Sequence, residues 1–282
     1  MSTLPRRAVL AAAVLAPSFA LSARAEPARE LTLGIVPNMS ARAILVNYQP
    51  FREYLAAYLA QPVAIATAPN FVDHHRRTMD DSYDIVVTAA NLGRVAQLDG
   101  GHRLVAVYEP GIPGLFVASK DRPVATLDAL RGRAVAMANP QSLVAMRAVQ
   151  WLEARGLRRD VDYRVVHTRN EESLAQLLAT GDAPLAVMSA GELRALSEDV
   201  RAGLHVHEEF VRVPGFFVLV SPCVDDKVAG RIARAVLEFP ATEAGKRFAE
   251  LTGVRAIREP RASDFAEVDP VIDGTRLALA PR

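Results

Sequence analysis

One pattern recurs along this chain: a short apolar strand, then small polar residues, then a helix. Its first copy is LTLGIVPNMSARAILVNYQPFREYLAAYL, residues 31–59, in which an alternating apolar strand gives way to Asn38 and Ser40. From Pro50 onward apolar and aromatic residues recur at helical spacing, so we expect a helix to begin there. Strands that alternate with helices predict a parallel-rich sheet flanked by helices.

The pattern occurs in two groups, which predicts two α/β lobes of similar plan. The expected strands are residues 31–36, 63–66, 83–87 and 103–108 in the first group, and residues 134–138, 163–166 and 185–188 in the second. Between the groups, residues 108–120 contain Pro and Gly where a crossing strand can bend. Residues 213–222 form an apolar strand that can return, and two crossings make a hinge.

The hinge strands divide the chain into three expected parts. Residues 1–25 are a signal peptide, residues 26–112 with 220–282 form lobe 1, and residues 113–219 form lobe 2. The signal has a basic start at Arg6 and Arg7, an apolar run and a small-residue exit, which is typical of cleaved export signals. The paired arginines also permit the twin-arginine route. The only cysteine, Cys223, is far from this end, so we expect a periplasmic protein that is not a lipoprotein.

Composition and motifs exclude several function classes. The formal net charge is +1 with dispersed basic residues, which argues against nucleic-acid binding. The sequence has no P-loop, nucleophile elbow, dinucleotide-binding glycine motif or zincin motif, so we expect neither an enzyme nor a cofactor. His205 and His207 share a strand face without a third placed ligand, so no metal site is predicted. His74 and His75 are helix neighbours that point apart, and we expect both at the surface.

The strand-to-helix junctions are the candidate binding site. Ligands of parallel α/β sheets bind at the carboxyl ends of strands, where helix N-termini favour anions. The alternative is that these residues are ordinary helix N-caps. The junctions carry Asn38 and Ser40, Asn70, Thr88 and Asn91, Asn139 and Ser142, Thr168 and Asn170, and Ser189. Arg169 is the basic side chain best placed to meet an anion, whereas Glu171 and Glu192 are interpreted as helix-capping carboxylates.

Several short motifs, in order, resemble the phosphate/phosphite/phosphonate family of ABC-transporter substrate-binding proteins (PhnD-like proteins). They are Gly34-Ile-Val-Pro37, the Pro50-Phe start of the first helix, Tyr83-Asp-Ile-Val86, Thr126-Leu-Asp-Ala-Leu-Arg-Gly132 and Gly181-Asp-Ala-Pro-Leu-Ala-Val187. The resemblance covers essentially the whole chain after the signal. It implies a two-lobed Venus-flytrap protein of type II that delivers a small oxyanion to an inner-membrane permease.

The resemblance also implies contact residues for the ligand. In the first lobe these are Asn38, Ser40, Phe71, Thr88 and Asn91. In the second lobe they are Asn139, Gln141, Ser142 and His167, to which the junction argument adds Arg169 and Ser189. The family's turn at this place is rich in Ser and Thr, whereas residues 139–142 carry one hydroxyl, at Ser142.

Two other functions stay open from the residues alone. The same protein could report its ligand to a membrane sensor kinase instead of a permease, and an enzyme on this fold is a minor alternative. We expect a monomer. The ligand itself, and whether residues 139–142 replace the family's hydroxyl-rich turn, are not fixed by the sequence.

Overall fold

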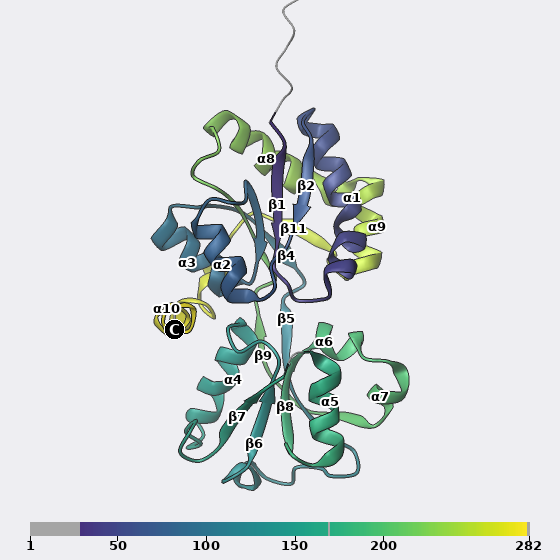
Figure 1. Ribbon diagram of the computed structural model, residues 1–282, viewed down its shortest axis with the longest axis vertical. Coiled ribbons are helices and arrows are strands. Elements are labelled where there is room, and N and C mark those ends of the chain that lie inside the picture. The colour runs from purple at the N-terminus through teal and green to yellow at the C-terminus, as the bar shows by residue number, and fades with distance from the viewer. Residues whose placement is uncertain (1–28, 169, 281–282) are drawn as a thin grey trace, which may run out of the picture.

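The computed structural model describes residues 29–168 and 170–280 and forms two lobes, each a mixed sheet flanked by helices (Figure 1). The expected signal peptide and Arg169 lie outside these residues. The α/β, two-lobed fold predicted from the sequence is confirmed. No helix within the described ranges is long and apolar enough to cross a membrane.

The first lobe contains a six-stranded sheet in the order β11-β4-β10-β3-β1-β2. Its strands are β1 (Leu31–Ile35), β2 (Val63–Ala66), β3 (Ile85–Thr88), β4 (Arg103–Glu109), β10 (Phe217–Val220) and β11 (Ala256–Arg258). Its helices are α1 (Ala41–Leu59), α2 (Phe71–Met79), α3 (Ala90–Gly100), α8 (Asp226–Glu238), η2 (Phe239–Ala241) and α9 (Glu243–Thr252). Strands β1, β2 and β3 are parallel, whereas β10 runs antiparallel because it returns from the other lobe.

The second lobe contains a five-stranded sheet in the order β7-β6-β8-β5-β9. Its strands are β5 (Ile112–Ser119), β6 (Ala134–Met137), β7 (Arg164–His167), β8 (Leu185–Ser189) and β9 (Leu204–Val213). Its helices are η1 (Leu127–Leu130), α4 (Leu143–Glu153), α5 (Glu171–Thr180), α6 (Ala190–Ala195) and α7 (Glu198–Ala202). The long β5 and β9 pair antiparallel and continue from the first lobe.

Two adjacent segments connect the lobes. One joins β4 to β5 through residues 110–111, and the other joins β9 to β10 through residues 214–216. Tyr108 N–H donates to the Phe216 carbonyl at 2.9 Å, so the segments are tied together. A Cβ at Gly215 would lie 2.1 Å from the Tyr108 oxygen, so only glycine permits this close approach.

The C-terminal segment forms a third contact between the lobes. It consists of η3 (Ala262–Phe265), η4 (Asp269–Val271) and α10 (Ile272–Leu279), and α10 lies beside α3 at the level where the lobes meet (Figure 1). Val268, Val271 and Ile272 share one buried cluster with residues of both lobes.

Two expectations about lobe 1 are wrong. Helix α1 begins at Ala41 and not at Pro50, because Ser40 accepts a hydrogen bond from Ala43 N–H and caps the helix earlier. His74 and His75 are 0% and 9% exposed, and His74 stacks on Tyr83 with ring centroids 5.4 Å apart. Both faces of this short helix are covered, so pointing apart does not bring either histidine to solvent.

Candidate functional site between the two lobes

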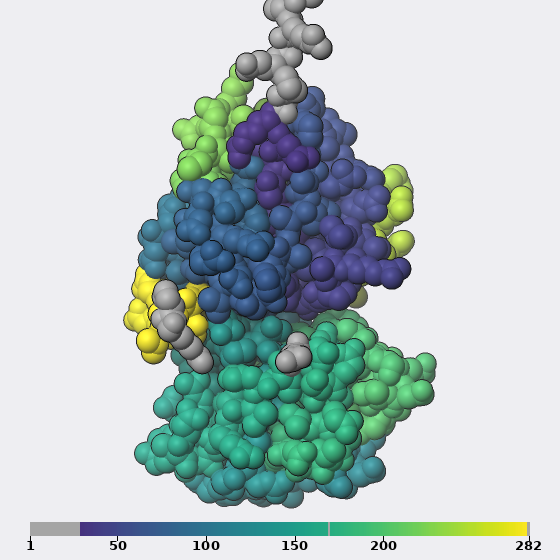
Figure 2. Space-filling model, in the orientation of Figure 1, coloured from purple at the N-terminus to yellow at the C-terminus, as the bar shows by residue number. Residues whose placement is uncertain are grey.

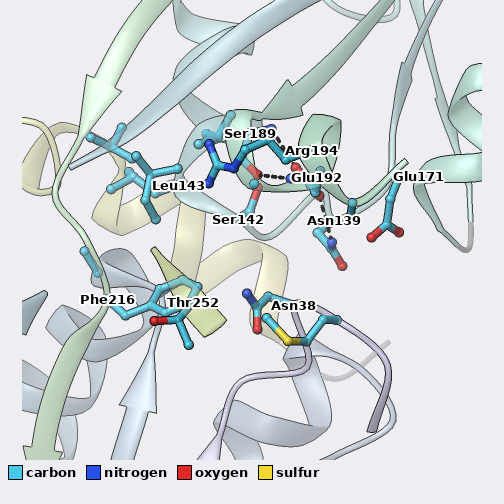
Figure 3. A pocket seen from close by; sticks show the side chains of 18 of the residues that line it. Asn38, Asn139, Ser142, Leu143, Glu171, Ser189, Glu192, Arg194, Phe216 and Thr252 are labelled. Carbon is cyan, nitrogen blue, oxygen red and sulfur yellow. Dashed lines mark hydrogen bonds between the residues drawn. The ribbon is translucent and has the colours of Figure 1, made fainter. Parts of the chain in front are cut away.

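A cavity of about 410 Å³ lies between the lobes and is lined by residues of both. The lobes meet across the middle of the molecule (Figure 2). Asn38, Phe216 and Thr252 lie on one side of the cavity, and Ser142, Ser189, Arg194 and Glu171 lie on the other (Figure 3).

The first lobe contributes the ends of two strands. The loop after β1 supplies Asn38 and Met39, and α3 begins at the cavity after β3 with Ala89 and Ala90. Ala89 is the N-cap of α3 and has no side chain that could accept a hydrogen bond. The first N–H groups of α3 therefore lack a capping partner where the helix reaches the cavity. Phe71, the first residue of α2, adds a buried ring to this wall.

The second lobe contributes the turn from β6 into α4. Ser142 caps α4 by accepting from Ala145 N–H at 3.2 Å. Leu143 and Val144 come next and line the cavity. Their N–H groups lie in the first helical turn, where no intrahelical acceptor exists. Two helix N-termini, from α3 and α4, thus reach the same cavity from opposite lobes.

Three charged side chains also line the cavity: Arg194, Glu171 and Glu192. The Glu192 carboxylate accepts from Ser189 N–H at 2.6 Å and from Asn139 Nδ2 at 3.3 Å, which confirms its capping role. Burial, together with the nearby charge of Glu192, raises the pKa of Glu171 above its ordinary value. Arg194 was not singled out from the sequence, although it follows the Ser189 junction by one helical turn.

Five of the predicted contact residues line this cavity. They are Asn38, Phe71, Asn139, Ser142 and Ser189. The cavity lining also includes Met39, Asn47, Phe216 and Thr252, which no sequence pattern indicated. Asn47 lies one helical turn beyond Ala43, and that register becomes visible only once α1 is known to begin at Ala41.

The other predicted contacts lie elsewhere. Ser40 is exposed and caps α1. Thr88, 2% exposed at the end of β3, has no hydrogen-bond partner for Oγ1 among the described residues. Asn91 is fully buried and bonds to Gln141 and Thr275. The sequence could not show this, because the C-terminal segment supplies the partner.

Gln141 and His167 line a second cavity, of about 720 Å³, between lobe 2 and the C-terminal segment. The turn at residues 139–142 separates it from the first, since Asn139 and Ser142 line one and Gln141 the other. Across residues 29–168 and 170–280, no group of three or more His, Cys, Asp or Glu side chains could hold a metal ion.

Two α/β lobes joined by two adjacent crossings define the class of two-lobed, type II periplasmic binding proteins. Within this class, the chain belongs to the family of phosphonate periplasmic substrate-binding proteins of ABC transporters, whose model matches residues 33–265. This confirms the family resemblance of the sequence motifs. It is a family of binding proteins, and its members work with a membrane transporter.

Solved structures of similar fold support the architecture. A binding-protein component of an ABC phosphonate transporter from Pseudomonas aeruginosa (PA3383) is 14% identical with a TM-score of 0.74, over 90% of this chain and 89% of that one. PhnD1 from Prochlorococcus marinus, solved with methylphosphonate, is 10% identical with a TM-score of 0.75, over 89% and 99%. XAC2383 from Xanthomonas citri, bound to chloride, is 15% identical with a TM-score of 0.74, over 88% and 98%. No curated protein sequence matches the chain.

Proposed function

We propose that this protein captures a small anion in the cavity between its lobes and delivers it to the permease of an ABC importer. The observation that carries the proposal is the arrival of two helix N-termini, those of α3 and α4, at one cavity with Arg194. Free N–H groups and the positive ends of helix dipoles stabilise negative charge. Arg194 adds a full charge and a planar fork of donors suited to oxyanions.

Ligand capture would close the lobes about the two crossings. Residues 110–111 and 214–216 are the short segments that could absorb a rotation. The anion would be held by groups from both sides and so would stabilise the closed form. We assign residues 26–112 and 220–282 to the lobe that holds α3, and residues 113–219 to the lobe that holds α4.

The setting of this function is the periplasm, reached through cleavage of the signal at residues 1–25. Family membership and the signal pattern of Arg6 and Arg7 support this location. The protein would act as a monomer without catalysis. The relatives' ligands, methylphosphonate in one structure and chloride in another, are consistent with an anionic cargo.

Thermal unfolding against an anion panel tests the proposal. The panel contains phosphate, phosphite, sulfate, methylphosphonate and 2-aminoethylphosphonate. A ligand at a hundred times its dissociation constant stabilises the folded state by about 2.7 kcal/mol, which shifts the melting temperature measurably. Arg194→Gln should abolish the shift, whereas Arg234→Gln, an exposed arginine on α8, should keep it. An anion that stabilises wild type and Arg194→Gln equally would refute binding in this cavity.

A further inference from the structure

We propose that the cargo is an organic anion with an apolar body and a single negative charge, and that Glu171 is the residue that rejects a second negative charge. This inference rests on the proposed function and narrows it. It excludes inorganic oxyanions and the doubly ionised forms of organic ones as preferred ligands.

Apolar side chains cover much of the cavity on both sides. Met39, Phe71 and Phe216 face it from one side, and Ile112, Leu143 and Val144 from the other. At about 30 Å³ of liquid volume per water-sized group, 410 Å³ holds on the order of a dozen such groups. Cavities of this size and lining enclose small organic molecules. A bare tetrahedral oxyanion would leave these apolar walls in contact with water.

The charges on the lobe 2 side fix the polarity of the cargo. Among the described residues that line the cavity, one side chain is a guanidinium, Arg194, and two are carboxylates, Glu171 and Glu192. The carboxylate of Glu192 is engaged by Ser189 N–H and Asn139 Nδ2. Glu171 lies on the same side of the cavity, next to Asn139 (Figure 3).

One negative charge on the ligand is therefore favoured and a second is opposed. The first pairs with Arg194 and the helix N-termini. A second charge in the same desolvated space meets the carboxylate of Glu171, whose own charge is already disfavoured by burial and by Glu192. Like charges in one site shift ionisation equilibria by about one to three pKa units, which is at least roughly tenfold in affinity between charge states.

Titration calorimetry with two matched ligands tests this inference. Butylsulfonate carries one negative charge at every accessible pH, whereas butylphosphonate loses its second proton near neutral pH. Each is titrated into the purified protein at about pH 6 and about pH 9. The ratio of the two affinities cancels titration of the protein itself. We expect butylphosphonate to weaken by about tenfold relative to butylsulfonate as it becomes doubly charged.

Two variants identify the residue responsible. Glu171→Gln should remove most of this tenfold change, because the opposing charge is gone. Glu172→Gln removes the same charge from the next, exposed position of α5 and should leave the change intact. An equal change in wild type and Glu171→Gln, or tighter binding of the doubly charged phosphonate, would overturn the role of Glu171.

A chain-length series tests the apolar body. From ethyl- to hexylsulfonate we expect affinity to rise by about fourfold per methylene until the cavity is full. Tighter binding of inorganic phosphate or sulfate than of any alkyl ligand would overturn this inference and leave the proposed anion binding standing. Failure of every organic and inorganic anion to bind would overturn both.

Discussion

Asn91 on α3 donates a hydrogen bond from Nδ2 to the main-chain oxygen of Gln141, which lies 2.9 Å away in the other lobe. The same amide group lies 3.2 Å from Thr275 Oγ1 on α10. One buried side chain thus joins lobe 1, lobe 2 and the C-terminal segment. It forms part of the boundary between the two cavities.

Replacement of Asn91 by Ala should destabilise the protein and couple to Thr275. The change removes bonds in a fully buried site, which costs about 1 to 3 kcal/mol of unfolding free energy. Thr275→Val removes the hydroxyl partner. In a double-mutant cycle measured by urea unfolding, the two effects should fall short of additivity by at least about 0.5 kcal/mol. Full additivity would show that Asn91 acts without Thr275.

Two arginine ion pairs of the C-terminal region should differ greatly in value. Arg258 donates to both carboxylate oxygens of the buried Asp264, at 2.8 and 2.7 Å. Arg276 makes the same double contact with Asp99, but both side chains are more than a third exposed. Arg258→Gln leaves a carboxylate buried without its partner and should cost about 3 to 5 kcal/mol. Arg276→Gln should cost less than about 1 kcal/mol and be sensitive to salt. Equal losses in denaturant unfolding would contradict this ranking.

The buried histidines of α2 should make the protein sensitive to acid. Burial lowers the pKa of His74 to about 3 and that of His75 to about 4. The unfolded chain therefore binds protons below about pH 6.5 that the folded chain does not. The stability that these neutral rings contribute is fully present above that pH and is lost as pH falls from about 6.5 toward 4.

His74→Phe should remove part of this loss. The phenyl ring can keep the stacking on Tyr83, and it replaces two ring nitrogens that have no partner among the described residues. At pH 5 the variant should retain about 2 kcal/mol that wild type loses relative to pH 7. His167→Phe, at an exposed position, serves as the control and should follow wild type. Identical pH profiles of thermal unfolding for wild type and His74→Phe would rule out this source of acid sensitivity.

Ser142→Ala should separate helix capping from ligand binding. Loss of the bond from Ala145 N–H to Ser142 Oγ should cost about 0.5 to 2 kcal/mol of stability without ligand. If the hydroxyl also contacts the ligand, the ligand-induced stabilisation should fall in addition. Ser40→Ala removes the equivalent cap of α1, outside the cavity lining, and should lower stability alone.

The sequence predicted the architecture because its signals are local. Apolar alternation in residues 31–36 and 83–87 marks strands, and the glycines and prolines near residues 110–114 and 214–215 mark the crossings. The start of α1 was misplaced because Pro50 suits a first turn, yet the capping residue Ser40 decides the boundary. The antiparallel entry of β10 between β3 and β4 depends on the second crossing and has no local signature.

The site was only partly predictable for the same reason. Topology alone brings the residues after β1 and β6 to one cavity, which places Asn38, Asn139 and Ser142 there. The role of Asn91 could not be read in this way, because its partner Thr275 is distant in sequence. Nor could that of Arg194, because its position depends on how α6 packs.

The most direct test of anion binding between the lobes is a crystal structure of the protein with the anion that stabilises it most. The account predicts the anion in the 410 Å³ cavity, in contact with Arg194 and with the first turns of α3 and α4. An anion found instead in the second cavity, beside His167 and α10, would contradict it.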